Sequence, residues 1–141
     1  MGPWPDFVQN TALPQVVKNV SSGQAVVTFI NHETFLIQLK DYNILTDPLF
    51  CERASPFSWI GPRRVRRPGI ELRDLPKIDL VLVSHNHYDH MDTESLKFLY
   101  DQFRPKFLVP LGNKIYFQEN KISGVIEKDW FEAVELGELK I

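Results

Sequence analysis

The sequence lacks the features that mark membrane, secreted and nucleic-acid-binding proteins. Cys51 is its single cysteine, so no disulfide can form within the chain, and a reducing compartment is expected. No apolar run reaches the roughly 18 residues of a membrane span, and no charged start precedes an apolar segment as in a secretory signal. The formal net charge of −2 argues against general binding to nucleic acid. We therefore expect a cytoplasmic protein that makes at most peripheral contact with a membrane.

The amino-acid composition is ordinary for a globular protein, and the length of the chain suits one domain. A chain of 141 residues can bury roughly two-thirds of its unfolded surface. Residues 1–23 include Pro3, Pro5 and Pro14, which predicts an N-terminal arm laid over the domain. Residues 24–141 are then expected to form a single unit.

Several segments have clear secondary-structure patterns. An antiparallel meander is predicted over residues 25–30, 34–39 and 43–46. Towards the C-terminus we expect a buried strand over 106–109, a helix over 113–118, a short strand over 124–126 and a solvated turn or edge over the acidic stretch 127–138.

The most distinctive stretch runs from Ser84 to Asp92. It follows Ile78–Val83, which is almost wholly apolar and is predicted to be a strand buried on both faces. Asp92 is suited to cap a helix over 93–100. Between strand and helix, four side chains that can bind a metal ion fall within six residues: His85, His87, Asp89 and His90. Imidazole and carboxylate groups are ligands of Zn²⁺, and they also suit Fe and Mn.

The spacing of these residues predicts two ions. Residues two apart in an extended segment point the same way, so His85 and His87 can hold one ion. Asp89 and His90 are adjacent, and the turn into the helix can direct both to a second ion. The alternative is a set of ordinary core or surface histidines. Because three of the four histidines in the chain lie here, we prefer the metal site.

This pattern resembles the hallmark of the metallo-β-lactamase superfamily of dinuclear hydrolases, His-x-His-x-Asp-His after a strand. Further motifs are similar to the N-acyl-phosphatidylethanolamine phospholipase D branch, and they occur in the expected order at residues 46–48, 61–68, 75–79, 83–90 and 110–112. The resemblance runs from about Ala25 to Trp130. It implies an α/β fold in which a mixed β-sheet with outer helices forms the N-terminal half of an α-β-β-α sandwich.

The resemblance also implies a function. Members are metal-dependent hydrolases, and this branch suggests a phosphodiesterase of the phospholipase D type that acts on N-acyl phospholipids or related phosphodiesters. Two zinc ions would supply hydroxide to attack phosphorus, and Asp89 would both bind metal and orient the hydroxide.

Two more residues gain expected roles from the family. Asp47 would support the ligand loop by accepting hydrogen bonds, although a turn-capping aspartate before Pro48 is an equal alternative. His32 matches a family histidine near the site, although we prefer a turn histidine without a metal role.

The ligand count is short of a full two-metal site. The family adds two histidines and a bridging aspartate from a second half, and no such residues follow His90 in this chain. We expect the chain to be inactive alone, and either to self-associate or to pair with a separate C-terminal half.

The long connection from Leu49 to Pro76 carries two further features. An apolar set comprises Phe50, Phe57, Trp59 and Ile60. Four arginines fall within five residues, Arg63, Arg64, Arg66 and Arg67, and arginine suits bidentate phosphate binding. An aromatic loop beside a basic one suits a phospholipid surface; the preferred alternative is core aromatics beside solvated ion pairs.

Other functions remain as alternatives. A non-catalytic metal-binding or interaction fragment agrees with the short ligand count. The same metal centre could also cleave a β-lactam, a thioester or nucleic acid. The missing secretory signal disfavours the first of these substrates, and the missing basic surplus disfavours the last.

Overall fold

The computed structural model describes residues 7–10, 13–53, 55, 59–61 and 63–141. Pro3 and Pro5 of the predicted arm, and Phe57 of the apolar set, lie outside the described residues. In the described part of the arm, Val17 exchanges hydrogen bonds with the buried side chain of Gln38, at 3.0 Å and 2.9 Å. The arm therefore lies against the first strands.

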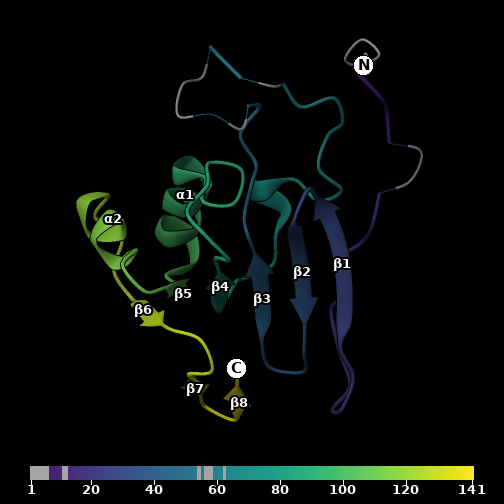
Figure 1. The fold of residues 1–141 in the computed structure, drawn as a ribbon. Coiled ribbons are helices and arrows are strands. Elements are labelled where there is room, and N and C mark those ends of the chain that lie inside the picture. Colours follow the sequence, from purple (N-terminus) through teal and green to yellow (C-terminus); the bar gives the residue numbers. More distant parts are fainter. Residues whose placement is uncertain (1–6, 11–12, 54, 56–58, 62) are drawn as a thin grey trace.

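One mixed sheet of six strands forms the centre of the fold, in the order β1-β2-β3-β4-β5-β6 (Figure 1). The strands are β1 (Val26–Asn31), β2 (Thr34–Gln38), β3 (Asn43–Thr46), β4 (Leu80–Leu82), β5 (Lys106–Pro110) and β6 (Val125–Lys128). β1, β2 and β3 pair antiparallel, which confirms the predicted meander, and β3 to β6 pair parallel. The mixed α/β class is therefore confirmed.

Two helices follow the parallel strands. α1 (Thr93–Phe103) connects β4 to β5, and α2 (Lys114–Glu119) connects β5 to β6, while a short 3-10 turn, η1 (Leu72–Asp74), precedes β4. α1 starts at the predicted cap and continues beyond Tyr100 to Phe103. Within the described residues, no helix is long and apolar enough to cross a membrane.

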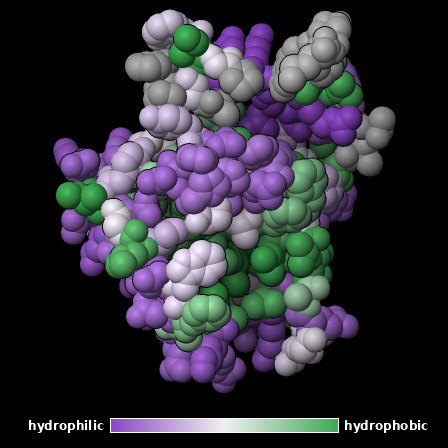
Figure 2. Space-filling view, in the orientation of Figure 1, coloured by the Kyte–Doolittle hydropathy of each residue, from purple (hydrophilic) through white to green (hydrophobic). Residues whose placement is uncertain are grey.

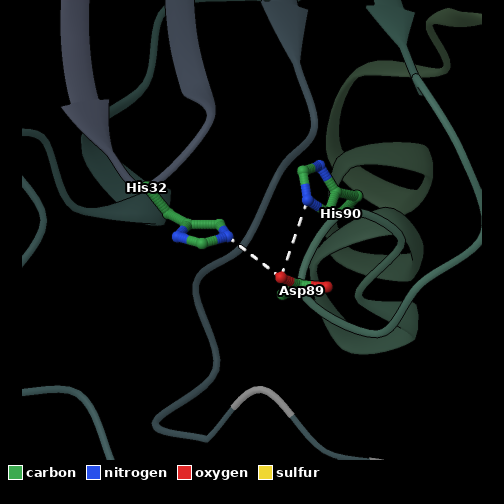
Figure 3. Close-up of side chains that lie close together, drawn as sticks. All are labelled: His32, Asp89 and His90. Atoms are coloured by element: carbon green, nitrogen blue, oxygen red, sulfur yellow. Dashed lines mark hydrogen bonds and ion pairs between the residues drawn. The ribbon is translucent and has the colours of Figure 1, made fainter.

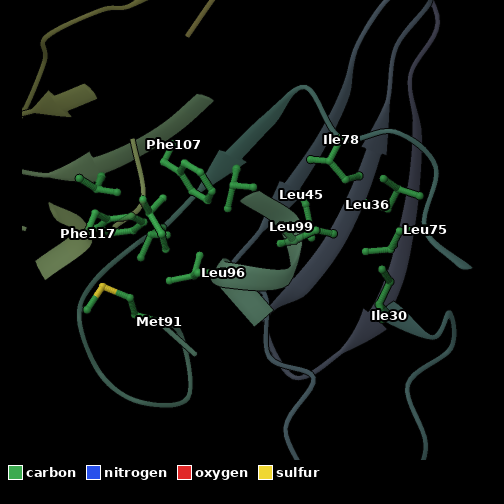
Figure 4. Close-up of a cluster of buried hydrophobic side chains, with 14 of the residues drawn as sticks. Ile30, Leu36, Leu45, Leu75, Ile78, Met91, Leu96, Leu99, Phe107 and Phe117 are labelled. Atoms are coloured by element: carbon green, nitrogen blue, oxygen red, sulfur yellow. The ribbon is translucent and has the colours of Figure 1, made fainter. Parts of the chain in front are cut away.

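The core lies between the sheet and the helices (Figure 4). A row of directly paired residues crosses the sheet on this face, formed by Leu36, Leu45, Val81 and Phe107, all fully buried. Leu96 and Leu99 of α1 and Phe117 of α2 belong to the same cluster and are also buried. This packing fixes the parallel strands, and with them the ends of β3 and β4 from which the candidate site is built.

The strand predicted over Ile78–Val83 is confirmed but shorter, since ladder pairing is restricted to Leu80–Leu82. Leu80 and Val81 are buried, as predicted, whereas Leu82 is half-buried. Leu82 pairs with Leu108, which pairs with Ile126, so these half-buried side chains form a second row on the other face. That face is apolar but only partly covered.

The acidic stretch after β6 contains more structure than predicted. Glu127 and Lys128 end β6, the edge strand, and a two-stranded hairpin follows, β7 (Glu135–Leu136) with β8 (Leu139–Lys140). The turn between β6 and β7 is solvated, as predicted, and it exposes Trp130 and Phe131 almost completely. The hairpin was missed because two-residue strands leave no alternating pattern.

Candidate metal centre

The candidate site lies at the carboxyl ends of two adjacent parallel strands. β3 ends at Thr46 and is followed by Asp47, while β4 ends at Leu82 and is followed by residues 84–92, here called the metal loop. Adjacent parallel strands end at the same edge of a sheet, where ligand sites of α/β proteins commonly form. The β1–β2 turn, with His32, meets the metal loop at the same edge, because β2 is antiparallel to β3.

A tight turn and a helix cap shape the metal loop. The backbone N–H groups of His90 and Met91 both donate to the carbonyl of His87, at 3.0 Å and 2.8 Å. Met91 is buried in the core and Asp92 caps α1, so the loop is held firmly at its C-terminal end. This geometry turns Asp89 and His90 towards the end of the β1–β2 turn.

Three potential ligands gather there: His32, Asp89 and His90 (Figure 3). One ligand atom from each lies within 4.8 Å of the others. His32 Nε2 is 3.1 Å from Asp89 Oδ2, and His90 Nε2 is 3.6 Å from the same oxygen. We call these three residues the triad. The structure thus places His32 in a turn, as preferred above, and also in contact with the predicted site.

The other two predicted ligands face each other. His85 Nε2 lies 3.0 Å from His87 Nδ1, and the ring of His85 is 4.0 Å from that of His90 between centroids. Two imidazole nitrogens on one tetrahedral zinc are separated by about 3.3 Å. His85 therefore faces His87 and also lies against His90, so the four predicted ligands gather in one place, and their division between two ions remains a prediction.

Asp47 joins the two strand ends through its side chain. Its Oδ1 accepts from the Ser84 backbone N–H and its Oδ2 from the Ser84 hydroxyl, both at 2.7 Å, and Oδ2 also lies 3.0 Å from His90 Nδ1. The side chain is buried, and its backbone has a φ of 34°. The buried Thr34 hydroxyl donates to the Asp47 carbonyl at 2.7 Å and so helps to hold this conformation. Ser84 was not singled out from the sequence; its only signal was its place between strand and ligands.

This arrangement fits a bound cation. When Nδ1 of His90 donates to Asp47, the proton stays on Nδ1 and Nε2 is free as a ligand towards the triad. Partial burial raises the pKa of Asp89, but hydrogen bonds from its own backbone N–H and from His32, with the nearby His90, lower it overall. The Asp89 carboxylate is therefore ready to bind a metal ion at neutral pH. Imidazole nitrogen and carboxylate oxygen together suit Zn²⁺, Fe or Mn.

Asp92 does more than cap a helix. Its buried Oδ2 accepts from the Ser95 hydroxyl and from the backbone N–H groups of Cys51, at 3.2 Å, and Phe50, at 3.4 Å. Arg64 donates to the carbonyls of Leu49 and Cys51 at 2.9 Å and 3.1 Å. Residues 49–51 are thus hydrogen-bonded to the metal loop on one side and, on the other, to residues 63–67, here called the arginine segment. The sequence suggested none of the contacts of residues 49–51, which join residues more than ten positions apart.

Cys51 is a structural rather than a reactive thiol. Its Sγ donates to the carbonyl of Arg53. Burial raises the pKa of Cys51 to about 11, and the Asp92 carboxylate contributes further. The thiolate is therefore scarce at neutral pH.

The four arginines divide into two pairs. Arg64 holds residues 49–51, and Arg63 pairs loosely with Glu52 at 3.4 Å. The guanidinium groups of Arg66 and Arg67 make no hydrogen bond or ion pair with the described residues, and both side chains are exposed. Of the apolar set, Phe50 packs against the core, whereas Trp59 and Ile60 are 75% and 50% exposed. Neither sequence interpretation therefore holds for the whole loop.

Comparisons with known proteins agree with this geometry. A sequence model described as a beta-lactamase superfamily domain matches residues 42–140, well over half of the chain. The chain belongs to this family. The superfamily predicted from His85, His87, Asp89 and His90 is therefore confirmed.

Two curated relatives illustrate the range of this superfamily domain. An uncharacterized protein of Mycobacterium tuberculosis is 34% identical over 134 residues, which is 92% of this chain and 36% of the relative. N-acyl-phosphatidylethanolamine-hydrolyzing phospholipase D 1 of Caenorhabditis elegans is 38% identical over 122 residues, 82% of this chain and 34% of that enzyme. The chain thus spans about a third of the length of these relatives.

A solved structure supports the fold. The crystal structure of a "possible metal-dependent hydrolase" from Veillonella parvula superposes with a TM-score of 0.64 at 20% sequence identity. The match covers 81% of this chain and 45% of that chain. At this identity the likeness shows a shared fold, which agrees with the six-stranded mixed sheet described above.

Proposed function

We propose that this beta-lactamase superfamily domain provides one side of the active site of a metal-dependent hydrolase, a phosphodiesterase acting on N-acyl phospholipids or related phosphodiesters. The observation that carries the proposal is the triad, with His85 and His87 beside it, at one edge of the sheet. The name of the C. elegans relative, 38% identical, supports the choice of substrate.

The residues of the chain have distinct tasks in this proposal. His85 and His87 would hold one ion, and Asp89 and His90 a second, with His32 as a further ligand or as a donor to Asp89. Asp47 orients His90 and fixes its tautomer. When bound, such ions lower the pKa of water and stabilise charge on phosphoryl oxygens. Asp89 has a second carboxylate oxygen with which it could orient the attacking water.

The open face of the sheet suggests how the site is completed. A hollow of about 830 Å³ runs along the strand ends, and its apolar lining includes Phe35, Leu82, Leu108, Trp130 and Phe131. Figure 2 shows apolar residues gathered over the strands at the right of the view. We propose that a second half of the protein covers this face and adds the remaining metal ligands, with residues 24–141 as the first half and residues 1–23 as an arm.

The isolated chain is therefore expected to bind metal without hydrolysing a phosphodiester. With its apolar face uncovered, it should also self-associate, since burial gains about 25 cal/mol per Å² of apolar area. Light scattering and an N-acyl-phosphatidylethanolamine assay with added Zn²⁺ would test both points. A monomer with metal-dependent turnover would show that the active site does not extend beyond this chain.

A chimera tests whether the chain supports catalysis once the rest of the active site is supplied. The part of the chain that matches the C. elegans enzyme over 122 residues would replace the corresponding segment of that enzyme, and hydrolysis of N-acyl-phosphatidylethanolamine would be measured. Activity should be recovered and should disappear on Asp89→Asn, while Tyr88→Phe, an exposed neighbour, should keep it. A chimera that binds metal but leaves this substrate intact would contradict the proposed substrate and favour another hydrolase or a non-catalytic metal-binding role.

A further inference from the structure

A cavity of about 420 Å³ lies next to the triad, between the end of β1 and the arginine segment. We call it the side pocket. Its lining includes Phe29, His32, Leu49, Arg66, Arg67 and Asp89. Two of them, His32 and Asp89, belong to the triad. A ligand group held at the triad can therefore extend directly into the side pocket.

The lining of the side pocket combines apolar and cationic groups. Phe29, Ile30, Leu49 and Val65 supply apolar surface, and Phe29 is an exposed residue. Four arginines face two carboxylates in the lining, which leaves a surplus of positive charge. Such a lining favours a ligand that is both apolar and anionic.

Two of the arginines are available for a ligand. Arg64 is already committed to the carbonyls of residues 49 and 51, as described above. Arg66 and Arg67 are exposed and form no ion pair with the described residues. A guanidinium group binds phosphate oxygens through two parallel hydrogen bonds, and it repels an ammonium group.

We propose that the side pocket binds the apolar part of an anionic phosphate ester while Arg66 and Arg67 hold its phosphate oxygens. This inference takes its class of ligand, a phosphate ester, from the proposed function. It adds a selectivity between head groups. Phosphate esters whose head group carries an ammonium ion are disfavoured, because that cation would lie close to the phosphate and would be repelled by Arg66 and Arg67, which line the pocket.

The chain offers a matched control for Arg66. Arg73 is also exposed and lines a neighbouring cavity of about 850 Å³, but it does not line the side pocket. Arg66→Gln and Arg73→Gln remove the same charge from the same loop region. A difference between them therefore measures the side pocket rather than the overall charge of the protein.

The test measures binding of dihexanoyl phosphatidic acid to the metal-free chain in EDTA at low salt, by calorimetry below the micelle concentration. Arg66→Gln should weaken binding about tenfold, the effect of one charge-assisted hydrogen bond, and Arg73→Gln should leave it unchanged. Phe29→Ser should weaken binding more than Val27→Ser, since both side chains are exposed on β1 but only Phe29 lines the pocket.

Two further ligands separate the contributions. Dihexanoyl phosphatidylcholine carries the same chains with an ammonium ion, and inorganic phosphate carries no chain; both should bind at least tenfold more weakly. Equal effects of Arg66→Gln and Arg73→Gln would overturn the inference, as would equal affinity for either comparison ligand. Because EDTA removes metal, the absence of phosphatidic acid binding would not argue against the proposed metal chemistry. Likewise, the absence of metal binding would not argue against binding of phosphatidic acid in the side pocket.

Discussion

Replacing His85 and His87 together by alanine is expected to abolish most Zn²⁺ uptake by the folded chain. Their facing nitrogens lie 3.0 Å apart, so the double substitution removes a pair of ligands that converge on one point. Metal content would be measured by elemental analysis after dialysis against a weak chelator.

Asn86→Ala is the matched control, because Asn86 lies between the two histidines and is exposed. The control should keep the zinc stoichiometry of the original chain. Unchanged stoichiometry in the double variant would show that the two histidines do not hold metal. Uptake reduced only to about half would contradict this expectation, because it would show that the triad holds an ion without His85 and His87.

The second large effect concerns stability. Asp92→Ala should lower the free energy of unfolding by about 2–4 kcal/mol, the cost of a lost helix cap together with newly unsatisfied buried donors. Those donors are the backbone N–H group of Cys51 and the Ser95 hydroxyl, whereas the Phe50 N–H keeps its 3.1 Å hydrogen bond to Ser95 Oγ. Urea denaturation at one fixed protein concentration would measure the change, since self-association makes stability depend on concentration.

Asp101→Ala provides the control for this effect. Asp101 lies on the same helix, its side chain is 68% exposed, and its contact with Arg104 spans 3.9 Å. An exposed pair of this kind contributes less than about 1 kcal/mol. Similar losses in the two variants would mean that the Asp92 carboxylate does not join the metal loop to residues 49–51.

The metal loop could be predicted from sequence because the residues that define it lie close together along the chain. An apolar strand, ligands at short spacing and a capping aspartate all fall within Ile78–Asp92, and each follows from the period of a strand or the start of a helix. The meander over β1 to β3 was predictable for the same reason.

Contacts between distant segments could not be predicted in this way. His32 and Asp89 are 57 positions apart, and they meet only because β2 pairs with β3 and β3 with β4. The sequence also gave no reason to separate Arg64 from Arg66. Their difference depends on where residues 49–51 run, which local pattern does not encode.

The central claim is that His85, His87 and the triad form a metal centre. Anomalous diffraction at the zinc absorption edge, from crystals of the chain grown with Zn²⁺, tests it most directly. We predict anomalous peaks about 2.0–2.2 Å from nitrogens of His85 and His87 and from Asp89 and His90 at the triad. Zinc bound elsewhere on the protein, with neither group occupied, would contradict the account.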